Sequence, residues 1–123
     1  MSNAPEPPVV SSPMPGNRET VERLRRYLPD AIVASLAGTQ DPAQVTRWAR
    51  GTAPPPEASI ERLRFALDTA DKMASGMSVT IAASWLVTAN AQLGGVLPVR
   101  AIREGRLGDV ADACSAFLDG YAG

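Results

Sequence analysis

Apolar residues recur at intervals of three and four along most of this chain of 123 residues, a spacing that predicts α-helices rather than strands. The first such stretch begins near Arg18 and stops at Pro29. A second short helix is predicted from Pro29 or Asp30 to Gly38, because proline fits a first helical turn and glycine ends many helices. No strand of real length is indicated, so the expected fold is all-α with about seven helices.

Proline and glycine divide the chain into four predicted regions. Residues 1–17 hold five prolines and no apolar period, so they are expected to form a disordered tail. Residues 18–55 are expected to form an N-terminal helical bundle, and residues 56–77 a connecting helix. Residues 78–123 are expected to form a small C-terminal helical domain, with helices near residues 78–87, 98–105 and 107–118 and a loop over 90–97.

The stretch from Asp41 to Gly51 predicts a third short helix with two unlike faces. Asp41 followed by Pro42 is typical of an N-cap and a first helical position, so the helix should run from Pro42 to Arg50. At roughly 100° per residue, the inward side of this helix holds Val45, Trp48 and Ala49. The outward side holds Ala43, Arg47 and Arg50, and Gln44 and Thr46 lie at the edges. Together with the second helix, this arrangement is typical of a helix-turn-helix.

The outer face of this third helix suggests DNA contacts. A small Ala43 would allow close approach to the bases, Arg47 or Gln44 could pair with a guanine or adenine edge, and Arg50 could reach a phosphate. Further contacts to the DNA backbone are expected from Thr39, Gln40, Arg23, Arg25 and Arg26. The alternative is a solvated basic face, because outward arginines are common on proteins that never touch DNA.

Charge and reactive residues narrow the functional classes. The net charge is only −1, but residues 18–64 carry eight arginines against six acids, and the remainder to Gly123 carries four bases against six acids. Histidine is absent, and Lys72 has no suitable catalytic neighbour in sequence, so no enzyme activity, metal or cofactor is expected. Cys114 is predicted to be a buried free thiol. No membrane span or signal peptide is indicated, which favours the cytoplasm.

The C-terminal residues carry a family resemblance. The run AASWLVTANAQLGGVLPVRAIREGRLGDVADACSAFLDG resembles the toxin-binding domain of the Xre/MbcA/ParS antitoxins, a domain that follows a helix-turn-helix in that family. The resemblance covers roughly residues 28–123 and rests on these positions: Trp85-Leu86, Asn90, Leu93, Pro98, Ile102-Arg103-Glu104-Gly105, Val110 and Phe117-Leu118-Asp119-Gly120.

The resemblance implies a type II antitoxin that represses its own operon and occludes a toxin, commonly a RES-domain enzyme that consumes NAD. Dimerisation is expected separately, because one short recognition helix reads only a few base pairs of double-stranded DNA. Candidate partner-binding residues are Trp85, Phe117, Leu118 and Tyr121. Trp85 could instead belong to the core or to a homodimer contact, and Phe117 could instead close the core. Two alternatives remain: a stand-alone transcriptional regulator, and a protein-interaction module without DNA binding. No small-molecule substrate is expected.

Overall fold

The computed structural model describes residues 16–122 and, within them, the side chains of residues 16–120. This part of the chain contains no strand, and its only bridge pairs Asn90 with Val96. Its elements are α1 (Asn17–Leu24), α2 (Asp30–Ala37), α3 (Pro42–Arg50), α4 (Glu57–Gly76), α5 (Val79–Leu86), the 3₁₀ turn η1 (Ala91–Leu93), α6 (Pro98–Arg103) and α7 (Leu107–Ala122). The prediction of an all-α fold is therefore confirmed.

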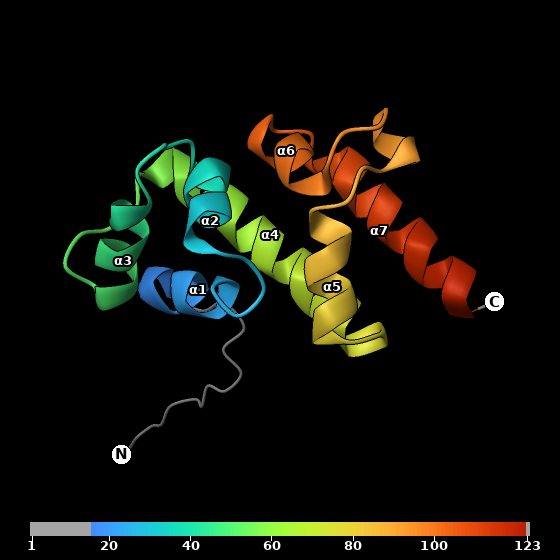
Figure 1. Cartoon of the computed structure of the whole chain (residues 1–123), viewed down its shortest axis with the longest axis horizontal. Helices are drawn as coiled ribbons and strands as arrows, with labels where there is room; N and C mark the ends of the chain where they lie inside the picture. The colour runs from blue at the N-terminus through green and yellow to red at the C-terminus, as the bar shows by residue number, and fades with distance from the viewer. Residues whose placement is uncertain (1–15, 123) are drawn as a thin grey trace, which may run out of the picture.

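Helix α4 is the long central element of the fold (Figure 1). Helices α1 and α2 pack against it, α3 packs on both of them, and α5, α6 and α7 also contact α4. The buried apolar side chains form one continuous cluster, with α2 also contacting α6. No helix within residues 16–122 is both long and apolar enough to cross a membrane.

Most predicted helix ends agree with the structure. Helix α3 spans Pro42–Arg50 as predicted, with the Asp41 side chain accepting the backbone N–H of Ala43 and Gly51 in the left-handed conformation. Helix α1 ends at Leu24, earlier than the predicted stop at Pro29, α7 continues past the predicted end at Leu118, and η1 lies inside the predicted loop. The predicted tail of residues 1–17 lies outside the described residues except for Gly16 and Asn17, where α1 begins.

The C-terminal end of α2 is held by side chains from α4. Arg62 donates from Nε to the Leu36 carbonyl at 2.9 Å and from Nη2 to the Ala37 carbonyl at 3.0 Å. The buried Ser59 hydroxyl also donates to the Ala37 carbonyl. Because the last carbonyls of a helix have no partner within the helix, these bonds satisfy them and attach the turn between α2 and α3 to the central helix.

Replacing Gly38 by alanine should lower the free energy of unfolding by about 1–2 kcal/mol, because L-residues with a side chain are strained at positive φ. Gly38 has a φ of +92°, and an added Cβ would lie 3.2 Å from Nη2 of Arg62, which is already hydrogen-bonded. Urea denaturation would measure the change. A matched control is Gly108→Ala in α7, where an added Cβ meets nothing within 4 Å and stability should not fall. Equal effects of the two substitutions would contradict this account of the turn.

Candidate nucleic-acid interface

Helix α3 presents the two faces that its sequence predicts. Val45, Trp48 and Ala49 are buried in the core, whereas Ala43, Arg47 and Arg50 are exposed. Gln44 and Thr46 are half-buried at the edges, as predicted. The Nε of Arg18 on α1 donates to the Ala49 carbonyl at 3.1 Å, so α3 is attached to α1 by a hydrogen bond as well as by packing. The basic face of α3 is therefore exposed while the opposite face is fixed.

The two outward arginines of α3 differ in their surroundings. Arg47 is 49% exposed, and its Nη2 lies 3.6 Å from Oδ2 of Asp41, which is itself 55% exposed. Arg50 is exposed and forms no ion pair with the residues that the structure describes. Neither guanidinium is shielded by the core, so both remain accessible to a ligand.

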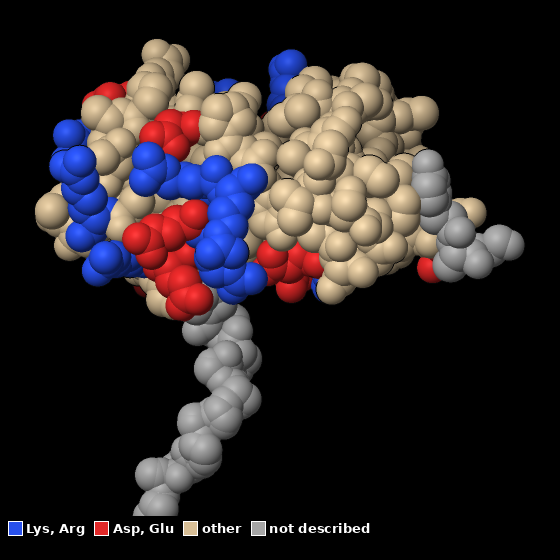
Figure 2. Space-filling view, turned by 60° about the horizontal axis from the view of Figure 1, so that its bottom comes forward, with Lys and Arg blue, Asp and Glu red and all other residues tan. Residues whose placement is uncertain are grey.

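The other predicted DNA contacts are spread over the turn and α1. Gln40 is exposed in the turn before α3, and Arg26 is exposed after α1 without an ion pair among the described residues. Arg25 pairs with Asp30 at 2.9 Å. Figure 2 shows the Lys and Arg side chains gathered over the N-terminal part of the molecule, interleaved with acids, whereas the C-terminal part is mostly uncharged in that view.

Arg23 is engaged inside the protein. Its Nη2 donates to Oδ2 of Asp71 on α4, and the Tyr27 hydroxyl donates to Oδ1 of the same carboxylate at 2.8 Å. Arg23 is only 35% exposed. Of the predicted backbone contacts near α1, Arg26 is thus more available for a phosphate than Arg23. Sequence spacing could not indicate this, because Asp71 lies 48 residues from Arg23.

The Tyr27 hydroxyl gives this cluster a pH dependence. Burial, followed by the hydrogen bond to Asp71 and the charge of that carboxylate, raises the pKa of Tyr27 from 10.0 to about 12. The folded chain therefore holds the phenol proton more tightly than the unfolded chain. The contribution of the Tyr27 hydroxyl to the free energy of unfolding is therefore fully present below pH 10 and is lost as the pH rises through about 12.

We expect Tyr27→Phe to remove this alkaline loss. Urea denaturation of both chains at about pH 8 and at several values between pH 10 and 12 would measure the free energy of unfolding. The wild type should lose more stability than the variant across that range, because a phenylalanine ring has no phenol proton to release. Parallel losses in the two chains would show that folding does not raise the pKa of the Tyr27 phenol.

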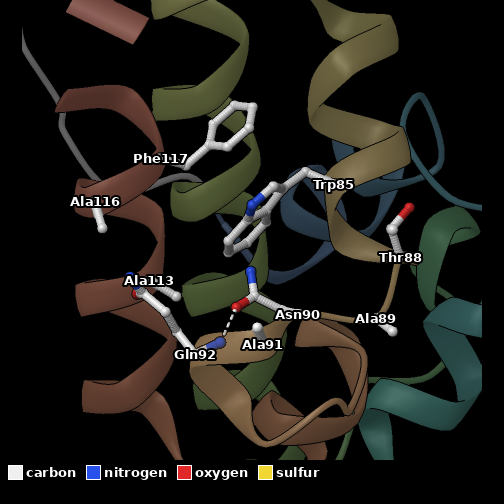
Figure 3. A pocket seen from close by; sticks show the side chains of 9 residues that line it. All are labelled: Trp85, Thr88, Ala89, Asn90, Ala91, Gln92, Ala113, Ala116 and Phe117. Carbon is white, nitrogen blue, oxygen red and sulfur yellow. Dashed lines mark hydrogen bonds between the residues drawn. The ribbon is translucent and has the colours of Figure 1, made fainter. Parts of the chain in front are cut away.

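A shallow groove of about 380 Å³ lies between α5, η1 and α7 (Figure 3). Trp85 from α5 and Phe117 from α7 face each other in it, with ring centroids 6.3 Å apart and planes tilted by 49°. Trp85 is only 8% exposed, so most of its surface contributes to the core. The rest of the lining is small or polar, and the sequence did not predict these residues as partner-binding: Thr88, Ala89, Asn90, Ala91, Gln92, Ala113 and Ala116.

The four predicted partner-binding residues do not form one surface. Leu118 lies beside Phe65, Cys114 and Ser115, and its Cδ2 would be 3.0 Å from a Cβ added to Gly76, so it faces α4 rather than the groove. The side chain of Tyr121 is outside the described residues. Of the three whose side chains are described, only Trp85 and Phe117 are brought together, because successive residues such as 117 and 118 point about 100° apart on a helix.

Several residues of the C-terminal half have structural roles. The Asn90 side chain accepts the Gln92 backbone N–H at 2.9 Å and caps η1, and Pro98 opens α6. Cys114 is buried and lies in no disulfide; burial raises the pKa of its thiol. Among residues 16–122, no group of three or more His, Cys, Asp or Glu residues could hold a metal ion.

Comparison of the chain with known protein families, with curated proteins and with solved structures finds no match. The function of this protein is therefore inferred from the geometry of α3, its turn and the groove.

Proposed function

We propose that this protein is a DNA-binding antitoxin of a type II toxin–antitoxin system, which represses its own operon and neutralises a partner toxin. The observation that carries the DNA-binding part is the exposed face of α3, where Arg47 and Arg50 stand opposite the buried Val45 and Trp48. A rigid helix with an exposed basic face, preceded by a short helix and a glycine turn, has the arrangement that helix-turn-helix proteins use in the major groove.

The three outward residues of α3 and Gln44 at its edge each have a role in this proposal. Ala43 has no bulk to keep the helix from the base edges, Arg47 or Gln44 supplies hydrogen bonds to a purine, and Arg50 contacts a phosphate. Arg26 adds a phosphate contact from the region after α1. Because one such helix reads only a few base pairs, two protomers would bind a palindromic operator as a homodimer.

The C-terminal half is proposed to bind the toxin. This part of the proposal depends on the resemblance of residues 78–123 to the antitoxin domain, for which a RES-type toxin is the implied partner. The groove beside Trp85 and Phe117 is a suitable contact region, since aromatic side chains are enriched in protein interfaces. No chemistry of the chain itself is required, because an antitoxin acts by occlusion.

A protein-interaction module that does not bind DNA is the alternative. Figure 2 favours this alternative, because the acidic side chains among the basic ones over the N-terminal part of the molecule reduce the attraction of that part for phosphates. Fluorescence anisotropy with a random duplex at low salt separates the two functions. A DNA-binding protein should retain non-specific affinity under these conditions, and an interaction module should show none.

Selection of duplexes from a random-sequence library tests the DNA-binding proposal directly. We expect the wild-type chain to enrich a palindromic sequence, and the region upstream of its own gene to contain that sequence. Enrichment of no sequence would contradict repression of any operon. The toxin is tested separately by co-expression of this protein with the product of the adjacent open reading frame, which should yield a stable complex. If the two proteins form no complex, the function that remains is that of a stand-alone transcriptional regulator.

A further inference from the structure

The side chain of Asp41 contacts both the N-terminal end of α3 and the guanidinium of Arg47. Its Oδ1 accepts the backbone N–H of Ala43 at 3.0 Å, which caps the helix, and its Oδ2 lies 3.6 Å from Nη2 of Arg47. The backbone N–H of Asp41 donates to Oγ1 of Thr39 at 3.2 Å, so the residue is held by the turn as well as by the helix. One carboxylate thus contacts both the helix end and the guanidinium expected to meet DNA.

The ion pair places the end of the Arg47 side chain at a particular part of α3. Arg47 lies six positions after Asp41, about 9 Å along a helix with a rise of 1.5 Å per residue. For the two side chains to meet, the arginine must extend back toward the N-terminal end of α3. That end of a recognition helix is the one whose residues contact base edges in the major groove.

We propose that Asp41 is a positioning residue, which orients the Arg47 guanidinium toward a base and away from the phosphates. This inference rests on the proposed DNA-binding function. An arginine has five N–H donors, so contact with one carboxylate oxygen leaves enough of them for a paired contact with O6 and N7 of a guanine. The negative charge of Asp41 also repels phosphates near Arg47. Both effects favour one base sequence over DNA in general.

The substitution Asp41→Asn distinguishes the positioning of Arg47 by Asp41 from a role in capping α3 alone. Asparagine caps a helix about as well as aspartate but carries no charge. If Asp41 only caps α3, loss of its negative charge should tighten binding to every duplex by a similar factor. If Asp41 positions Arg47, affinity for the selected duplex should fall while affinity for random duplex rises. We expect the ratio of the two affinities to fall about tenfold, within the range for loss of one paired base contact.

The test measures affinities for the library-selected duplex and for a random duplex by fluorescence anisotropy. Glu22→Gln is the matched control, because Glu22 on α1 lies 3.7 Å from Arg18 and forms no ion pair with Arg47 in the described part of the chain. Its loss of charge should strengthen both affinities alike. In an Arg47→Ala background, Asp41→Asn should change the affinities for the selected and the random duplex by the same factor, because no guanidinium remains to be positioned. Thermal unfolding should be unchanged in Asp41→Asn, which excludes loss of the cap.

The possible failures are distinguishable. If the wild type selects no sequence, the proposed function itself is wrong. If it selects a sequence but Asp41→Asn changes both affinities by the same factor, DNA binding stands and the positioning role is overturned. A rise in affinity for the selected duplex alone would also overturn that role, because it would mean that Asp41 competes with DNA for Arg47.

Discussion

Arg47→Ala is expected to lower affinity for the selected duplex at least about 100-fold, while affinity for random duplex falls only a few-fold. The reason is geometric: Arg47 is exposed on the outer face of α3, and a paired contact to a base contributes about 1–3 kcal/mol of discrimination. The proposed homodimer would make that contact twice. Gel shifts or anisotropy with the two duplexes would measure both losses.

Arg26→Ala is the matched control for charge. It removes one positive charge from an exposed arginine of the same half of the molecule, but one placed after α1 rather than on α3. We expect similar weakening with every duplex and a smaller dependence on salt, as for a phosphate contact. Arg23 would be a poor choice, since removing it would leave Asp71 without its ion pair. Equal behaviour of Arg47→Ala and Arg26→Ala would assign both residues to the DNA backbone.

The sequence was most informative where local interactions decide the structure. Asp41, Pro42 and Gly51 specify the ends of α3 through capping, proline at the first turn and a left-handed glycine, and each of these acts within a few residues. The two faces of the helix follow from its period alone. The C-terminal end of α7 and the turn η1 were less predictable, because α7 continues through Gly120, a residue type that ends many helices, and η1 depends on the Asn90 cap.

Contacts between distant segments set the limit of the sequence prediction. Arg23 and Arg26 are both arginines near the end of the first predicted helix, yet only Arg23 meets Asp71 on α4. Likewise, Arg62 is one of several basic residues in the sequence, but in the fold it satisfies the last carbonyls of α2. Which arginine binds within the protein and which remains available to DNA depends on helix packing, and that packing is not encoded in spacing along one helix.

Trp48→Ala should have the largest effect on stability, a loss of about 3–5 kcal/mol, because it removes a large buried side chain and leaves a cavity. Trp48 is 2% exposed and belongs to the core cluster shared by α1, α2 and α4. A domain of this size typically has about 5–15 kcal/mol of stability, so a large share would be lost. Urea denaturation followed by far-UV circular dichroism is suitable, since the substitution also removes a fluorophore.

Arg50→Ala, on the opposite face of the same helix, should change stability by no more than about 0.5 kcal/mol. The contrast between the two variants tests whether α3 is fixed by its inner face alone.

Trp48→Ala should also weaken DNA binding, because a loosened α3 can no longer hold Arg47 in register with a base. Trp48→Phe should recover part of both properties, since an aromatic ring fills most of the cavity. A small stability loss in Trp48→Ala, below about 1 kcal/mol, would mean that the basic face of α3 is not presented from a rigid core.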